Sequence, residues 1–238
     1  SDLVLAEHGR VELDALAAAL AARYEAEPWR GYGAQTHILL GKIHGGGNWR
    51  ELARAINDGQ GSYGNDAAAR VAPLGAYFQD DGDERIAAQA RLSAEVTHSH
   101  PLARDGAAAV ALAAAWMGRQ GEAIAAGEAD SDGMFALVLE HVREEPLRAL
   151  IEQARALSAD TPVRDVTDAL GCGRQVTAQD TVPFCLWAAA RNAGNFEAAM
   201  WTTVSGLGDR DTNCAIVGGI VAAGAGVPGG WVKRRERV

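Results

Sequence analysis

Apolar residues recur at helical spacing along most of this chain. Leu13, Leu16, Leu20 and Tyr24 form one stripe, and the segment 147–157 repeats the pattern. Positions three and four apart share one face of an α-helix, so such stripes predict amphipathic helices. Strict alternation over five or more residues, which would predict strands, is scarce.

The spacing predicts about ten helices, with turns rich in Gly, Asn and Asp between them. Pro28, Pro101, Pro146 and Pro183 lie at or near the expected helix starts or between helices. The expected helices span residues 11–26, 48–58, 66–78, 83–97, 102–118, 133–143, 146–158, 180–193, 195–205 and 212–225.

The helices are expected to form one compact all-α domain over residues 1–238. No period of 30 to 50 residues indicates a solenoid, and no Pro/Ser-rich linker divides the chain. Alanine-rich stretches at 15–22 and 107–115 indicate helices that pack closely through small side chains.

Composition excludes several classes of function. The chain has 238 residues, 48% of them hydrophobic, and a formal net charge of −9, which argues against non-specific binding to nucleic acid or anionic membranes. No stretch approaches 18 uninterrupted apolar residues, so no bilayer span is expected, and no signal peptide is visible. The three cysteines, Cys172, Cys185 and Cys214, suggest no disulfide framework or zinc motif, so a cytoplasmic location is expected.

The stretch QGSYGNDAAAR interrupts a helix-forming sequence with a glycine-rich turn. Gly61 and Gly64 can adopt positive φ, and a helix beginning near Asn65 would add unpaired N–H groups and a positive dipole end. Ser62 offers a hydrogen-bond donor, and Tyr63 a flat face for a ribose or base. The turn therefore predicts a diphosphate-binding site. The alternative explanation is a loop in which Asn65 simply caps a helix.

A second candidate lies at residues 208–226. If the backbone is extended there, Asp209 and Asp211 point to the same side, and Thr212 adds a hydroxyl. Hard oxygen ligands of this kind suit Mg²⁺ or Mn²⁺. Alternatively, Asp211 is a helix N-cap and Asp209 a solvated charge. Two glycines at 218–219 inside the following helix indicate that something approaches it closely.

The third candidate is the sequence THSHP. His98 and His100 lie two residues apart before Pro101. Such a pair is more often structural than functional, and a zinc site would need a third ligand, which is absent nearby.

In this order and on an all-α background, the three motifs resemble the ADP-ribosylglycohydrolase family. The closing GVPGGWV and the long segment that begins DTVPFCLWAAARNAG and runs through GLGDRDTNCAIVGG extend the resemblance over most of the chain. It implies a compact orthogonal helical bundle with a binuclear Mg²⁺ or Mn²⁺ centre. It also implies hydrolysis of the N- or O-glycosidic bond between ADP-ribose and an acceptor on a protein or small molecule.

The resemblance also assigns residues by position. Asp209, Asp211 and Thr212 match the carboxy-terminal half of the family's metal site. The turn Gly61, Ser62, Tyr63, Gly64 and Asn65 matches the loop that holds the diphosphate and adjoining ribose. His98 matches a histidine that helps to hold the ligand near the diphosphate.

Two departures from the family pattern bear on activity. The family usually has glycine where this chain has Asp66, and often methionine where it has Ala69. A carboxylate at position 66 would oppose the binding of an anion unless it points away or is paired. The family's amino-terminal Thr-Asp-Asp metal triplet and catalytic-region glutamate have no match here. We expect either that the chain was truncated or trimmed, or that half the metal site has been lost; the acid–base group is unassigned.

These departures keep a second hypothesis open: an ADP-ribose-binding module without turnover. A third class, the all-α metal phosphohydrolases, usually shows His-Asp pairs on helices, and this sequence has none. The acceptor whose bond is cleaved is also left open.

Overall fold

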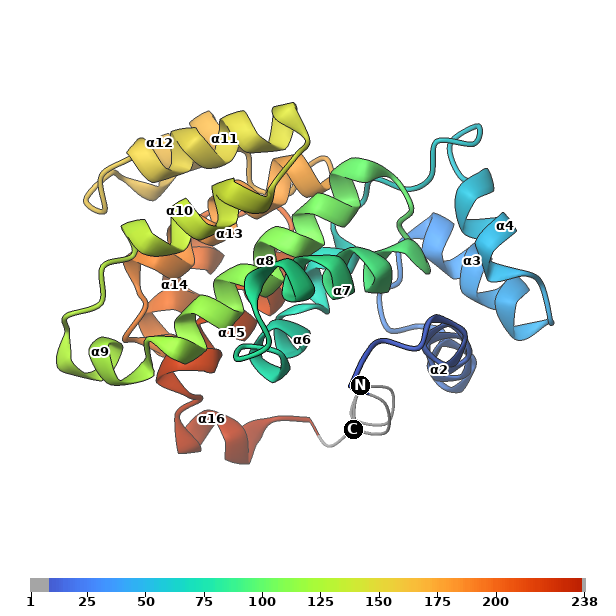
Figure 1. Ribbon diagram of the computed structural model, residues 1–238, viewed down its shortest axis with the longest axis horizontal. Helices are drawn as coiled ribbons and strands as arrows, with labels where there is room; N and C mark the ends of the chain where they lie inside the picture. The colour runs from blue at the N-terminus through green and yellow to red at the C-terminus, as the bar shows by residue number, and fades with distance from the viewer. Residues whose placement is uncertain (1–8, 237–238) are drawn as a thin grey trace.

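The prediction of an all-α fold is confirmed. The computed structural model describes residues 9–236, and within that range it contains fifteen α-helices and no strand (Figure 1). The helices are α2 (Leu13–Ala26), α3 (Ala34–His44), α4 (Trp49–Ala55), α5 (Asp66–Ala69), α6 (Ala72–Tyr77), α7 (Asp83–Glu95), α8 (Pro101–Arg119), α9 (Gly121–Ala126), α10 (Asp132–His141), α11 (Glu145–Ala156), α12 (Val163–Leu170), α13 (Ala178–Arg191), α14 (Phe196–Ser205), α15 (Arg210–Ala225) and α16 (Gly229–Arg234).

Helix α8 runs through the centre of the molecule, with α6, α7, α10, α13 and α15 packed around it (Figure 1). Every residue from Asp105 to Met117 is buried. Small side chains permit this packing: a Cβ placed at Gly75 of α6 would clash with the carbonyl oxygen of Ala111. The alanine-rich stretch at 107–115 is therefore the close-packed core helix that the sequence predicted.

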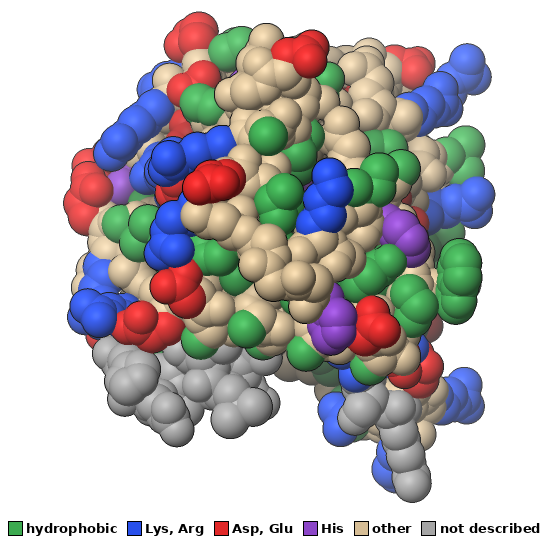
Figure 2. Space-filling view, turned by 90° about the vertical axis from the view of Figure 1, so that its right-hand side faces the viewer, with side chains coloured by type: hydrophobic (Ala, Val, Ile, Leu, Met, Phe, Trp, Pro, Cys, Tyr) green, Lys and Arg blue, Asp and Glu red, His purple; other side chains and the backbone are tan. Residues whose placement is uncertain are grey.

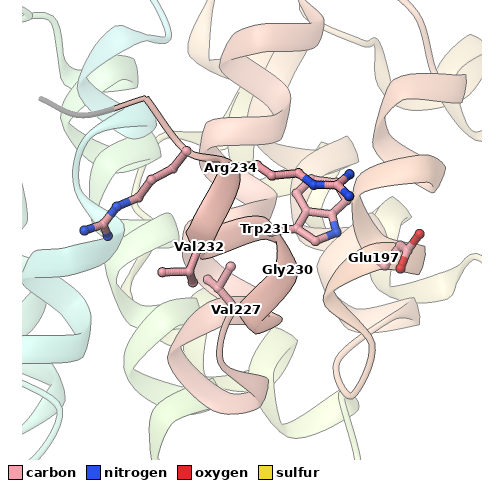
Figure 3. Close-up of a pocket in the computed structure, with 7 residues that line it drawn as sticks. Glu197, Val227, Gly230, Trp231, Val232 and Arg234 are labelled. Atoms are coloured by element: carbon pink, nitrogen blue, oxygen red, sulfur yellow. The ribbon is translucent and has the colours of Figure 1, made fainter.

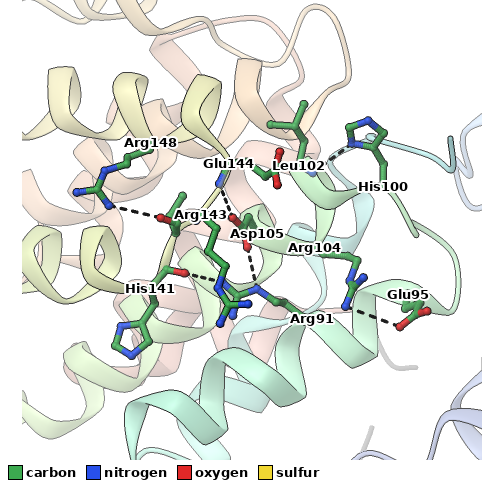
Figure 4. Close-up of polar contacts among 11 residues, drawn as sticks. Arg91, Glu95, His100, Leu102, Arg104, Asp105, His141, Arg143, Glu144 and Arg148 are labelled. Atoms are coloured by element: carbon green, nitrogen blue, oxygen red, sulfur yellow. Dashed lines mark hydrogen bonds and ion pairs between the residues drawn. The ribbon is translucent and has the colours of Figure 1, made fainter.

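An ion pair is buried where α7, α8 and the segment after α10 meet (Figure 4). Arg91 Nε donates to Asp105 Oδ1 at 2.7 Å. The other carboxylate oxygen, Asp105 Oδ2, accepts the backbone N–H groups of Arg143 at 2.6 Å and Glu144 at 2.8 Å. One buried side chain therefore ties three segments together.

The predicted helices match α2, α4, α7, α8, α10, α11, α13, α14 and α15, but the predicted helix 66–78 is two helices. It breaks between α5 and α6 because Pro73 has no N–H to donate to the carbonyl four residues earlier. Four further helices, α3, α9, α12 and α16, were not predicted; three of them have only six to eight residues.

The described surface carries both signs of charge. Figure 2 looks onto the end of the molecule that holds α2, α3 and α4, where acidic and basic side chains are interspersed. Within residues 9–236, no helix is both long and apolar enough to cross a bilayer.

Candidate functional site

Two neighbouring cavities contain most of the predicted site residues. The loop cavity, of about 250 Å³, is lined by Ser62, Tyr63, Gly64 and His98, among others. The acidic cavity, of about 380 Å³, is lined by Asp211, Thr212, Arg70 and Tyr32, among others. Asp66 lines both cavities, so the two adjoin at its side chain.

The glycine-rich turn needs its two glycines for different reasons. Gly61 has φ +82°, and a Cβ there would also clash with the Ser99 hydroxyl. Gly64 does not have positive φ, contrary to what the sequence suggested. Its constraint is steric, because a Cβ would lie 3.0 Å from His98 Nε2. Both glycines therefore let the turn pack against the segment 98–100.

The side chains of the turn differ in accessibility. Ser62 is buried, and its Oγ accepts the Gly64 N–H at 3.3 Å, which leaves the hydroxyl proton free to donate. Tyr63 is 39% exposed, so one face of its ring is open to a ligand. The turn is fixed to the start of α13 by a backbone bridge between Gly64 and Thr177 and by the Ala178 N–H, which donates to the Tyr63 carbonyl at 3.0 Å.

The contacts of Asn65 fit neither of the two roles that the sequence suggested, an anion-binding helix start or a helix cap. The helix after it, α5, is a single turn, so it offers a much weaker dipole than predicted. The Asn65 side chain does not cap that helix either. It is fully buried, and its amide donates to Thr181 Oγ1 at 3.0 Å and to Asp209 Oδ2 at 2.8 Å. The glycine-rich turn and the acidic pair therefore meet through a direct hydrogen bond.

The acidic pair lies at the start of α15, which begins at Arg210, so the backbone is not extended through both residues. Asp209 is the N-cap residue, and Asp211 lies in the first helical turn. Their side chains still lie near each other, because the Asp211 carboxyl contributes to raising the pKa of Asp209. Burial is the main reason that the pKa of Asp209 is raised; the Asn65 amide lowers it, and the Asp211 carboxyl raises it again.

A loop that the sequence analysis missed supports Asp209 from the other side. The Asp209 N–H donates to the carbonyl of Cys172 at 3.1 Å, and the Asn213 side chain donates to the same carbonyl at 2.9 Å. A Cβ at Gly173 would lie 2.7 Å from the Asp209 Cβ. The glycine pair at 171 and 173 was the only sequence signal for this close approach.

The two glycines inside α15 also have a packing explanation. A Cβ at Gly219 would lie 2.6 Å from the Cβ of Ala72 in α6, and a Cβ at Gly218 would lie 3.4 Å from the Met200 methyl group. The close neighbour that the sequence indicated is thus the protein's own helices.

His98 is a neutral group at the edge of the loop cavity. Its Nδ1 shares a hydrogen bond with the Thr97 hydroxyl at 2.7 Å, and its Nε2 lies 3.8 Å from Asp66 Oδ2. Burial lowers the pKa of His98 to about 3, and the Arg70 guanidinium acts in the same direction. His98 can therefore hydrogen-bond a ligand but carries no charge near neutral pH.

His100 has a separate structural role. Its Nδ1 accepts the Leu102 N–H at 3.1 Å and so caps α8. Its ring packs edge-on against Tyr63, with the ring centroids 5.5 Å apart. The two histidines therefore have separate contacts and do not form one site. Within residues 9–236, no cluster of three or more His, Cys, Asp or Glu side chains has the arrangement of a metal site.

The low pKa of His98 predicts a pH-dependent stability. The unfolded chain, with a histidine pKa near 6.5, binds more protons than the folded chain between pH 6.5 and about 3. Stability is therefore lost as the pH falls below 6.5. Between pH 7 and pH 5, His98 should account for about 1–2 kcal/mol of the loss. Urea unfolding at both pH values should show a smaller loss for His98→Gln; an equal loss would contradict the prediction.

Val176, on the rim of the loop cavity, has a strained backbone. It is β-branched, has φ +56° and is 50% exposed. Val176→Asn should stabilise the fold by about 1 kcal/mol, because Asn tolerates this left-handed conformation far better. Val176→Ala is the control, because it also removes the exposed valine side chain but alanine does not tolerate positive φ as asparagine does. Urea midpoints compare the three proteins, and equal gains for Asn and Ala would disprove the strain.

A larger hollow lies elsewhere and lacks the candidate chemistry. It has a volume of about 780 Å³ and lies beside α16, lined by Trp231, Val227, Val232 and Arg234, among others (Figure 3). None of the predicted site residues borders it. Size alone does not make it the functional site, since Glu197 is the single acidic side chain among the described residues that line it.

Comparisons with known proteins agree on one family. The family model described as ADP-ribosylglycohydrolase matches residues 2–237. ADP-ribosylhydrolase ARH3 of Bos taurus is 29% identical over 263 residues, covering 98% of this chain and 70% of the relative. ARH3 of Homo sapiens is 29% identical over 262 residues with the same coverage. A solved structure, an ADP-ribosylglycohydrolase-related protein complex, matches with a TM-score of 0.53 and 25% identity over 94% of this chain and 76% of that one.

Proposed function

The chain belongs to the ADP-ribosylglycohydrolase family, and from this premise we propose that it hydrolyses the glycosidic bond between ADP-ribose and an acceptor in a metal-dependent reaction. The observation that carries the proposal is the 2.8 Å hydrogen bond from Asn65 to Asp209. It joins an anion-binding turn to an acidic pair, the two chemistries that an ADP-ribose conjugate requires. None of the comparisons favours the alternative of a binding module without turnover.

The loop cavity would hold the diphosphate. Its turn has an open tyrosine face at Tyr63, a hydroxyl proton at Ser62 and a neutral imidazole at His98. These groups can bind phosphate oxygens and a ribose or base without forming part of the reacting bond. Binding energy gained away from that bond positions the anomeric carbon at the acidic pair.

Asp209, Asp211 and Thr212 fit one side of a Mg²⁺ or Mn²⁺ site. They offer hard oxygen donors, and a cation would offset the repulsion between the two carboxylates. When bound, such a cation polarises the oxygen atoms that coordinate it and lowers the pKa of water. The three side chains form a partial ligand set, so further ligands would come from the substrate, from water or from residues beyond this group.

The chain's own residues keep that pair in place. Asn65 and the backbone of the segment 172–173 hold Asp209 from opposite sides. Glycoside hydrolysis passes through an oxocarbenium-like state whose positive charge nearby carboxylates stabilise.

We also propose that the protein works in the cytoplasm. This is supported by its three free thiols, Cys172, Cys185 and Cys214, since a reducing compartment keeps thiols free.

The test is release of ADP-ribose from ADP-ribosylated proteins and from a small-molecule ADP-ribose conjugate. We expect release with Mg²⁺ or Mn²⁺ and none with EDTA. Calorimetric binding of ADP-ribose without release at any metal concentration would favour the binding module. If the chain neither binds ADP-ribose nor releases it from a conjugate, the proposed function is refuted.

A further inference from the structure

Asp66 occupies the boundary between the loop cavity and the acidic cavity. It is the first residue of α5 and lines both spaces, with 38% of its side chain exposed. Any molecule that extends from the turn at 61–64 to Asp211 must therefore pass this carboxylate.

The carboxylate is oriented but not fully occupied. Thr36 Oγ1 donates to Asp66 Oδ2 at 3.2 Å and so fixes the side chain against α3. The other oxygen, Oδ1, accepts no hydrogen bond from any residue within 9–236. It is therefore an available acceptor on a side chain that lines both cavities.

Among the described residues Asp66 forms no ion pair with an arginine or lysine, although its charge is attracted to the nearby Arg70 guanidinium. His98, 3.8 Å away, is neutral near physiological pH. The Arg70 guanidinium donates instead to Thr97 Oγ1 at 3.0 Å and to the Ser93 carbonyl at 2.9 Å. A diphosphate in the loop cavity would therefore be repelled by the part of this negative charge that Arg70 does not offset. A contact between Asp66 and another part of the ligand would compensate for that repulsion.

We propose that Asp66 accepts hydrogen bonds from the hydroxyl groups of the ligand's terminal ribose and so selects ADP-ribose against ADP. The proposal rests on the proposed function, which places the diphosphate in the loop cavity and the glycosidic bond at the acidic pair. The ribose joins these two groups, so it crosses the boundary where Asp66 lies. Adjacent hydroxyls are two donors, and a carboxylate is the strongest neutral-pH acceptor among side chains.

Calorimetric titration of ADP-ribose and ADP into the same chain tests this selection, with Mg²⁺ present throughout. Asp66→Asn keeps the shape and removes the charge. We expect ADP-ribose to bind about tenfold more weakly, because a charge-assisted hydrogen bond is lost. ADP should bind about two- to threefold more tightly, because only the repulsion is removed.

Two further variants complete the design. Thr36→Val frees the carboxylate from its anchor without changing its charge, so ADP-ribose binding should weaken and ADP binding should not improve. Asp165→Asn makes the same change of charge on the exposed face of α12, away from both cavities, and should alter neither affinity.

The inference fails if Asp66→Asn strengthens both ligands by the same factor, which would make Asp66 only a repulsive charge, or if neither affinity changes. If Asp66→Asn does not fold, unchanged ADP-ribose binding by Thr36→Val refutes the inference by itself. Failure of the proposed function is distinct: the wild-type chain would then bind neither ligand and release no ADP-ribose, and the inference would fall with it.

Discussion

Replacing Asp211 with Ala should abolish metal-dependent release of ADP-ribose, lowering the rate by at least about a hundredfold. Asp211 lies in the first turn of α15 and lines the acidic cavity beside Thr212. Its carboxylate converges on that of Asp209. Under the proposed function, its removal would leave one carboxylate of the pair to hold a divalent cation and to stabilise positive charge at the anomeric carbon.

Two measurements separate the loss of the cation from damage to the fold. Mg²⁺ should raise the thermal midpoint of the wild-type chain by mass action and leave that of Asp211→Ala unchanged. Asp211→Asn keeps the side-chain volume and should lose nearly as much activity, because an amide is a weaker ligand for a hard cation. Unchanged release by either variant would refute the metal assignment.

Two stretches of the predicted site lie in contact in the structure, although their local geometry differs from the prediction. The turn at 61–65 and the segment 209–212 meet through the hydrogen bond between Asn65 and Asp209. Local pattern alone could not show this, because Asn65 and Asp209 are 144 positions apart. Such a contact depends on how α5, α13 and α15 pack, and pairwise spacing carries no information on that packing.

The contacts of individual residues also differ from those that the sequence predicted. Asn65 was expected at the ligand or as a helix cap, yet it is buried and holds Asp209. Its second partner, Thr181, lies 116 positions away. The segment 171–177 was missed altogether, because glycines next to a short polar run have the same appearance in any surface loop.

The helix assignments failed where local signals conflict. Residues 66–78 have alanines at helical spacing, and this outweighed Pro73 in the prediction, whereas in the structure the proline ends the first helix after one turn. Helix α3 contains Gly41 and ends beside the glycines at 45–47, so its composition resembles a loop. Contacts with α2 and α4 stabilise it, and these are tertiary contacts.

Replacing Asp105 with Ala should reduce the free energy of unfolding by about 3–5 kcal/mol, the largest stability effect we expect in this chain. Asp105 and Arg91 have side chains that are only 4% and 10% exposed (Figure 4). The variant would leave the Arg91 guanidinium buried without its counter-charge. It would also leave the N–H groups of Arg143 and Glu144 without their acceptor.

The structure provides a matched control in an Asp–Arg pair of similar geometry near the surface. Asp83 and Arg119 lie 2.8 Å apart with side chains 34% and 29% exposed, so Asp83→Ala should cost less than about 1 kcal/mol. Urea unfolding measures both variants, and equal losses would contradict the assigned role of burial. The double variant Asp105→Leu with Arg91→Met should be more stable than Asp105→Ala. The double variant has no buried guanidinium without a partner. A higher stability than that of Asp105→Ala would show that the loss of stability comes from one unpaired buried charge and not from the absence of an ion pair.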